Sequence, residues 1–289
     1  ASALFGEPWL IVSEARFDAR DSLILAATPF DPALLERDYP QRFARERVLR
    51  MSANDVVEAF EEIRFDAIVM ERRAVPPGPE DALPALLALI RDRGVEALPW
   101  SDATTRLRAR IAWLCTTMPE TGLPDVSDAA LLGSLESWLA PTLHGKRKLD
   151  ALSASELSDA FAALLTWPQR KLLDDEAPEA LRVPSGRTLK LDYLSHDTGA
   201  AASSPVLAVK LQELFGLAET PRVANGRIPV TLHLLSPAGR PIQVTQDLRG
   251  FWDRTYSEVK KELKGRYPKH PWPDDPWSAT PTHRAKPRR

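Results

Sequence analysis

Residues 75–79 read Val75-Pro76-Pro77-Gly78-Pro79, and this run separates two different patterns of apolar residues. Proline lacks an amide hydrogen and fixes φ, so such a run ends regular structure and marks a boundary. Before it, a short helix is expected at 32–37, and apolar residues gather in strand-like stretches at 9–12, 22–26, 45–51, 56–64 and 65–72. Several short, closely spaced strands predict a small OB-like β-barrel over residues 1–76.

After the proline-rich run, the apolar residues recur at helical spacing. They repeat every three to four positions between Asp81 and Gly94, and again over 102–115. Two further helices are expected, one capped by Ser127 and one that begins at Ser155. These segments predict a helical region over residues 81–180.

Strand-like runs return beyond Pro184. Strands are expected at 187–193, 227–235 and 241–246, and helices at 206–215 and 251–263. The sequence therefore predicts an α+β protein in three parts. Residues 181–289 form its C-terminal mixed α/β domain, which ends in an irregular basic extension rich in proline and tryptophan.

The charges of the 289 residues are unevenly distributed. The net charge is −2, but residues 221–289 hold 14 Lys and Arg against 6 Asp and Glu, a net of +8. This asymmetry favours an anionic partner for the C-terminal part, nucleic acid being the commonest. The alternative is a tail that neutralises the acidic body of its own chain.

The cysteine content indicates where the chain works. Cys115 is the only cysteine, so no intrachain disulfide is possible, and a cytoplasmic, reducing setting is expected. No stretch of 18 apolar residues occurs, so no membrane partner is expected.

Sequence motifs for catalysis are missing from the chain. A phosphate-binding P-loop needs Gly-x-x-x-x-Gly-Lys-Ser/Thr, and the nearest run, His144-Gly145-Lys146-Arg147, lacks the first glycine and the hydroxyl. No Asp-Glu-Ala-His run is present either. One cysteine and five scattered histidines give no pair at zinc-ligand spacing. We therefore expect no enzyme activity and no cofactor or metal in this chain itself.

The run from Gly265 to Trp277 interleaves cations with aromatic rings. Cations neutralise phosphates and flat rings stack on bases, which together suit a single strand of nucleic acid. The alternative is structural, because Trp and Pro often pin an irregular segment onto a domain. The candidate nucleic-acid-binding residues are Arg240, Arg266, Tyr267, Lys269, His270, Trp272, Trp277, Arg284, Lys286 and Arg288.

The same C-terminal residues resemble a known family. The run Leu234-Leu235-Ser236-Pro237-Ala238-Gly239-Arg240-Pro241, followed by Gly265-Arg266-Tyr267-Pro268-Lys269-His270-Pro271-Trp272-Pro273, is similar to the C-terminal signature of HrpB helicases, which are DEAH-box proteins. Upstream, Leu98-Pro99-Trp100-Ser101 and Phe5-Gly6-Glu7-Pro8-Trp9 also resemble that family, so the resemblance covers nearly the whole chain.

The resemblance implies a non-catalytic C-terminal region of an ATP-dependent RNA helicase. ATP and Mg²⁺ would bind, and ATP be hydrolysed, in motor domains upstream of this region, and no motor motif occurs here onto which the family's ATPase residues could be carried. Two roles follow as expectations. The chain binds single-stranded RNA or DNA, or clamps the motor domains of its own polypeptide. Alternatively, it is a protein-interaction module for the motor or a separate partner and binds no nucleic acid.

Overall fold

The computed structural model describes residues 4–17, 22–52, 54–194 and 201–284. These divide into two compact units. Unit 1 holds residues 1–86 together with Gly145–Leu149, and unit 2 holds residues 87–144 and 150–289. The predicted helical region and the predicted C-terminal domain fall largely within unit 2. The break between the units lies inside helix α2 (Pro79–Arg93), a few residues after the proline-rich run.

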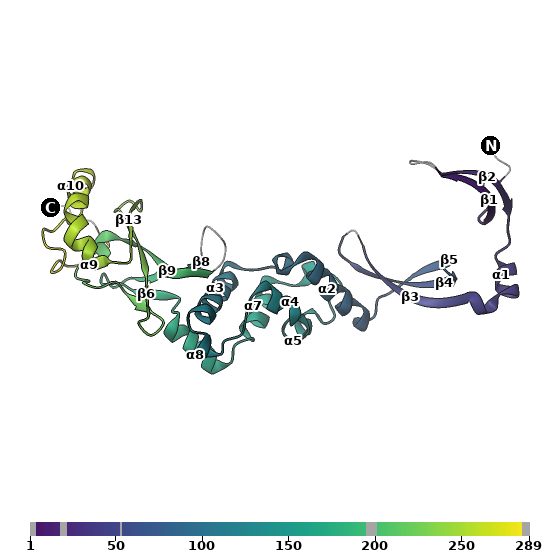
Figure 1. The fold of residues 1–289 in the computed structure, drawn as a ribbon, viewed down its shortest axis with the longest axis horizontal. Coiled ribbons are helices and arrows are strands. Elements are labelled where there is room, and N and C mark those ends of the chain that lie inside the picture. The colour runs from purple at the N-terminus through teal and green to yellow at the C-terminus, as the bar shows by residue number, and fades with distance from the viewer. Residues whose placement is uncertain (1–3, 18–21, 53, 195–200, 285–289) are drawn as a thin grey trace. The chain divides into compact units, whose positions relative to one another are not determined.

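Unit 1 contains two open sheets (Figure 1). The hairpin of β1 (Leu10–Phe17) and β2 (Ser22–Pro29) is followed by α1 (Ala33–Asp38) and the 3-10 turn η1 (Pro40–Arg42). The strands β3 (Phe43–Met51), β4 (Val57–Phe65) and β5 (Ile68–Val75) form an antiparallel sheet with β4 in the centre. The strand predictions are confirmed where residues are described, and the turn at 18–21 lies outside them.

The predicted OB-like barrel is not confirmed. Closure would require β1 or β2 to pair with β3 or β5, and no such ladder joins the two sheets among the described residues. The physical reason lies in the hairpin, whose described residues are exposed or half-buried on both faces, so it is not folded around a core shared with the other sheet.

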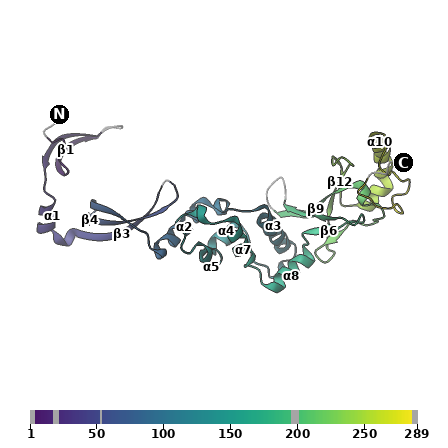
Figure 2. The same cartoon turned by 180° about the vertical axis from the view of Figure 1, so that it is seen from behind.

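Unit 2 begins with helices, as the apolar spacing predicts (Figure 2). Its α-helices, after the end of α2, are α3 (Asp102–Thr117), α4 (Asp128–Gly133), α5 (Leu135–Trp138), α6 (Ala140–Leu143), α7 (Ala154–Ala162) and α8 (Trp167–Glu176). Its 3-10 turns up to this point are η2 (Val95–Ala97), η3 (Pro119–Thr121) and η4 (Leu149–Ala151), the last of which starts on the final residue of unit 1.

The helix starts in unit 2 are set by side-chain caps. Ser101 and Ser127 accept a backbone amide at the first turns of α3 and α4, and Ser153 forms a capping box with Glu156 at α7. The core beneath holds fully buried Trp113 and Phe161. The sequence therefore determines these helices by local signals that the fold then buries.

The strands of unit 2 are short and belong to several sheets. Their bounds are β6 (Ala180–Arg182), β7 (Thr188–Lys190), β8 (Asp192–Leu194), β9 (Ala201–Lys210), β10 (Arg222–Val223), β11 (Ile228–Pro229), β12 (Thr231–Leu235) and β13 (Pro241–Thr245). The largest sheet has the order β13-β12-β9-β8, with β9 and β12 parallel. Helix α3 packs against it, and the rings of Trp113 and Tyr193 lie 5.1 Å apart.

One sequence prediction in this region is wrong. Residues 206–215 were expected to be helical, but residues up to Lys210 belong to strand β9, and the 3-10 turn η5 (Leu211–Glu213) follows. Leu207 and Val209 are buried while Ala208 between them is exposed, which is the period of a strand. Parallel pairing with β12, a long-range contact, decides between the two periods.

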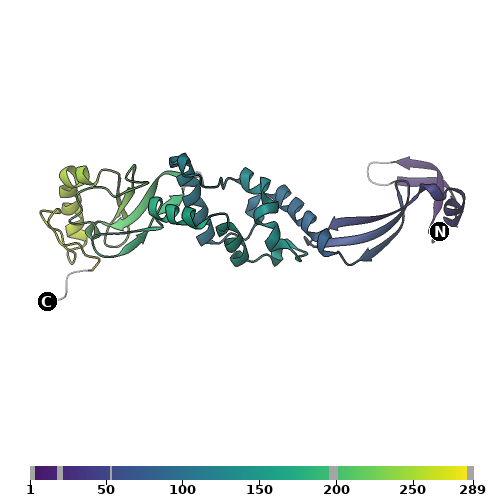
Figure 3. The same ribbon diagram turned by 90° about the horizontal axis from the view of Figure 1, so that it is seen from below.

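The chain then forms a nearly continuous helix beside this sheet. It consists of α9 (Leu248–Gly250), the π-helical turn η6 (Phe251–Thr255) and α10 (Tyr256–Arg266), coloured yellow-green in Figure 3. This confirms the helix predicted at 251–263.

None of the described helices has the length and apolar character that crossing a membrane requires.

Candidate nucleic-acid interface

Buried aromatic side chains hold α10 and η6 on unit 2. Trp252 and Tyr256 lie one helical turn apart on the same face, and both pack against the fully buried ring of Phe215 at 6.0 and 6.1 Å. The indole nitrogen of Trp252 donates to the Leu217 carbonyl at 2.9 Å. Burial raises the pKa of Tyr256, and its hydroxyl donates to the carbonyl of Pro273 at 2.9 Å.

The irregular segment after α10 is fixed by backbone and ring hydrogen bonds. Gly216 donates its amide to the Pro276 carbonyl, and Thr282 donates to the Gln212 carbonyl, each at 3.0 Å. The indole nitrogen of Trp272 donates to the Tyr267 carbonyl at 2.9 Å. Residues 267–282 are therefore an ordered part of unit 2, although they contain no helix or strand.

A groove of about 640 Å³ runs between α10 and this segment. Its lining residues are Trp252, Asp253, Tyr256, Ser257, Lys260, Lys261, Lys264, Asp274, Asp275, Pro276 and Trp277. We call it the α10 groove. Three lysines and three aspartates line it, so its formal charge is balanced, and the pairing of these charges decides what the groove offers.

The charges pair unevenly in the α10 groove. Lys260 forms an ion pair with Asp274, and its ammonium group holds the pKa of that carboxyl below its usual range. Asp275 accepts from the Ser278 hydroxyl at 2.6 Å and from the Trp277 amide at 2.8 Å, which also lowers its pKa. Lys261 and Lys264 are exposed and form no ion pair within the described part of the chain. The charge of Lys264 also acts on Asp274 without forming an ion pair with it. Two exposed lysines thus share a groove with the half-buried ring of Trp277.

The structure places the predicted residues in different environments. Trp272 is only 8% exposed, which favours the structural alternative for this ring. Trp277 and Tyr267 are half-buried, and Tyr267 and His270 lie with ring centres 6.4 Å apart. His270 shares a hydrogen bond with Gln212 at 2.9 Å, and burial, together with the charge of Lys210, lowers its pKa.

The predicted cations are all exposed where they are described. Arg266 lies 3.7 Å from the carboxylate of Glu262, whereas Lys269 and Arg240 form no ion pair among the described residues. Arg240 sits on the turn between β12 and β13, and Arg284 contacts the ring of His283. Lys286 and Arg288 lie outside the described residues. The roles of these residues in binding remain predictions.

Sequence reasoning missed Lys261 and Lys264. The signal was present, because Lys261 belongs to the amphipathic helix predicted at 251–263 and Lys264 immediately follows it, and both are charged positions among its apolar residues. Only the structure shows that Trp277 faces the same groove.

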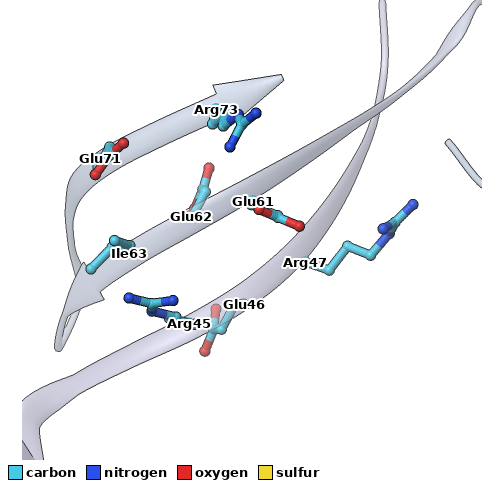
Figure 4. Close-up of a pocket in the computed structure, with 8 residues that line it drawn as sticks. All are labelled: Arg45, Glu46, Arg47, Glu61, Glu62, Ile63, Glu71 and Arg73. Carbon is cyan, nitrogen blue, oxygen red and sulfur yellow. The ribbon is translucent and has the colours of Figure 1, made fainter. Parts of the chain in front are cut away.

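A second depression, of about 510 Å³, lies on the sheet of β3, β4 and β5 in unit 1 (Figure 4). Its lining residues are Arg45, Glu46, Arg47, Glu61, Glu62, Ile63, Glu71 and Arg73. Four glutamates against three arginines give it no cationic excess, so it is a weaker candidate for a polyanion than the α10 groove. In the part of the chain that the structure describes, no His, Cys, Asp and Glu group is arranged to hold a metal ion.

The comparisons with known proteins point to a helicase. Residues 138–276 match a family model described as "ATP-dependent helicase C-terminal" (HrpB_C). The "ATP-dependent RNA helicase HrpB" of Escherichia coli strain K12 is 38% identical over 281 residues, which cover 96% of this chain and 34% of that protein. The chain therefore corresponds to a C-terminal region of an ATP-dependent helicase.

Two solved structures agree with this match. The crystal structure of the E. coli DExH-box NTPase HrpB gives a TM-score of 0.68 at 35% identity, over 96% of this chain and 34% of that one. The crystal structure of the Escherichia coli DEAH/RHA helicase HrpB gives 0.59 at 32% identity, over 91% and 33%. The chain belongs to the HrpB helicase family, and it spans about a third of the length of the curated relative it matches.

Proposed function

We propose that this chain is an accessory region of an HrpB-type ATP-dependent helicase that binds single-stranded nucleic acid along the α10 groove. One observation carries the proposal. The exposed lysines Lys261 and Lys264, which form no ion pair among the described residues, lie in one groove with the half-buried ring of Trp277. Ammonium groups neutralise phosphates, and an indole ring stacks on a base, so the groove supplies both contacts that a single strand needs.

The α10 groove is pre-organised for this role. Its walls are held by Trp252 and Tyr256 on one side, and by the hydrogen bond from Gly216 to Pro276 on the other. A ligand therefore meets a formed surface and the chain loses little conformational entropy on binding. Lys269, two residues beyond Tyr267, is a further exposed cation after the end of α10.

Fluorescence anisotropy with a labelled oligouridine of about 20 nucleotides, and with the DNA analogue, tests the proposal. Log K, where K is the association constant, falls as log [salt] rises. Replacing Lys261 and Lys264 together by Ala makes this fall less steep, reducing the size of the slope by about 1.4, because each single-strand phosphate contact contributes about 0.7. Trp277→Ala weakens binding by about 1–3 kcal/mol without changing that slope. Arg266→Ala with Lys269→Ala tests the cations that the sequence predicts.

The matched control removes two exposed lysines elsewhere on unit 2, Lys171→Ala with Lys190→Ala. If this control weakens binding as much as the groove variant does, the effect is one of net charge and the groove has no special role. Absence of salt-dependent binding by the parent chain rejects the proposal outright.

A second candidate function is docking, and the β1–β2 hairpin favours it. Ile11 is 55% exposed, Ile24 is 51% exposed and Phe17 is 82% exposed. An isolated two-stranded hairpin is at best marginally stable in water, so a hairpin with this much exposed apolar surface needs a partner. The partner we propose is the motor part of the same HrpB polypeptide, since this chain covers 34% of its curated relative.

Pull-down with the separately expressed motor portion tests docking. Ile24→Asp places a charge on the apolar hairpin and is expected to weaken capture at least tenfold, because burying an unpaired carboxylate costs well over 1 kcal/mol. Val244→Asp is the matched control, since Val244 is also an exposed apolar strand residue but lies in unit 2. Equal capture of the two variants would count against docking through the hairpin.

A further inference from the structure

The segment Gly145–Lys148 belongs to unit 1 although it follows more than fifty residues of unit 2. It contains Lys146, Arg147 and Lys148 in succession, and we call it the basic loop. As a sequence it resembles a phosphate-binding loop only superficially, because it lacks the first glycine and the hydroxyl that such a loop requires. The fold, however, pairs its backbone with the start of β4.

The basic loop is attached to the central strand of the unit 1 sheet. The amide of Val57 donates to the Arg147 carbonyl at 3.0 Å, and Val56 and Lys148 form an antiparallel bridge. Met51 of β3 pairs with Val57 on the other side, and β5 stops pairing with β4 at Ala59. The loop therefore continues the sheet alongside β4 beyond the point where β5 ends.

Backbone and side-chain anchors fix the loop at both ends. Leu149, the last residue of this segment of unit 1, is buried directly after Lys148. Gly145 has a φ of +76°, a conformation that residues with a β-carbon rarely adopt, so the turn depends on glycine. The positively charged side chains thus project from a fixed backbone.

Unit 1 holds both paired and unpaired cations, and Arg45 and Arg73 on its sheet form no ion pair among the described residues. Arg42, Arg64 and Arg72 each pair with a carboxylate there. Arg147 and Lys148 are exposed and form no ion pair with any described residue. A cation pair that the fold holds at a sheet edge, and does not neutralise, fits a polyanion.

We infer that the basic loop is a second nucleic-acid contact, which binds phosphates of the backbone and does not read bases. No aromatic residue occurs in the loop, so it has no ring to stack on a base and no preference for sequence. The inference rests on the proposed function because it assumes the same ligand, but it uses a different unit of the chain and different residues.

The whole chain is titrated with labelled oligouridine of about 20 nucleotides at several salt concentrations. Arg147→Ala with Lys148→Ala is expected to lower the salt slope by about 1.4 and to weaken binding roughly tenfold at 0.1 M salt. The charge-preserving variant Arg147→Lys with Lys148→Arg restores the slope. Both variants keep the loop's backbone bond to Val57, and a thermal unfolding curve equal to that of the parent confirms that they fold.

The two proposals fail in distinguishable ways. If the alanine variant has the parent's slope while Lys261→Ala with Lys264→Ala lowers it, the basic loop makes no contact and only the α10 groove binds. If the loop variant alone lowers the slope, the basic loop is supported and the groove is not. If the parent does not bind the oligonucleotide, both are overturned. If the charge-preserving variant has the same shallow salt dependence as the alanine variant, the loop proposal is also overturned, because the effect of the alanine substitutions would then not be due to lost charge.

Discussion

Replacing Glu62 by Ala should destabilise the sheet of unit 1 more than any other single loss of charge there. The carboxylate of Glu62 is 1% exposed in the centre of the sheet. It accepts from Arg72 at 2.8 Å, and guanidinium groups of Arg50 and Arg64 lie 3.6 Å away. The substitution leaves Arg50 and Arg72 without a carboxylate partner among the described residues and leaves Arg64 with Glu46 alone.

The size of the stability loss in Glu62→Ala depends on how exposed the three arginine partners of Glu62 are. Removing one member of a fully buried ion pair costs about 3–5 kcal/mol, because the other charge is left without a partner. The side chains of Arg50, Arg64 and Arg72 are 51%, 30% and 38% exposed, so they can turn towards water and recover part of this energy. We expect a loss of about 2 kcal/mol, which is roughly a 30-fold increase in the opening equilibrium of the sheet.

Hydrogen exchange measured by mass spectrometry resolves this effect in unit 1 separately from unit 2. Amides of β4 should exchange roughly 30-fold faster in Glu62→Ala and be less affected in Glu62→Gln, which keeps the shape and one acceptor. Glu46→Ala is the matched control. Glu46 lies on the same face, 3.5 Å from Arg64, but is 52% exposed, so its loss should change exchange less than threefold. Equal acceleration in Glu62→Ala and Glu46→Ala would refute the argument from burial.

Three further predictions concern unit 2. Trp272→Ala should lower the free energy of unfolding by about 3 kcal/mol in urea titrations because a buried ring is lost, whereas Trp277→Ala should change it by less than about 1 kcal/mol. Asp247→Ala should cost about 1 kcal/mol in the same assay, since Asp247 caps α9 by accepting the Gly250 amide at 2.8 Å; an unchanged midpoint would contradict this. Burial and Lys210 lower the pKa of His270 below its ordinary 6.5, so the unfolded chain binds the proton more readily. The contribution of neutral His270 to the free energy of unfolding is therefore fully present above about pH 6.5 and is lost as the pH falls below that value. Over this pH range the urea midpoint should drop less steeply in His270→Gln than in the parent.

The helices of unit 2 could be predicted because their signals are local. The helix expected to begin at Ser155 begins at Ala154, because Ser153 and Glu156 make a capping box whose partners are in the same turn. The strand β9 could not be assigned in the same way, because Val206 to Leu211 contains apolar residues that fit either period. Its pairing with β12 lies more than twenty residues away, and a contact of that kind cannot be read from a window of sequence.

The candidate site shows the same limit. Trp272 and Trp277 stand in nearly identical proline-rich surroundings in the sequence, yet one ring is buried and the other faces the α10 groove. The indole nitrogen of Trp272 donates to the carbonyl of Tyr267, whereas no ring hydrogen bond of Trp277 occurs among the described residues. Composition indicated the candidate region, and the tertiary structure shows which of its two rings is buried and which lines the groove.

The apolar pattern of the β1–β2 hairpin carries information beyond the number of strands, which was the basis of the barrel prediction. Leu10-Ile11-Val12 and Leu23-Ile24-Leu25 are consecutive apolar residues, and neighbouring residues of a strand point to opposite faces. Both faces of this hairpin are therefore apolar, which is typical of strands covered on both sides. A small barrel with one solvated face would instead alternate apolar and polar residues. Because both faces are exposed in the described structure, the pattern favours a strand pair that is covered from outside unit 1, in agreement with docking onto the motor part of an HrpB polypeptide.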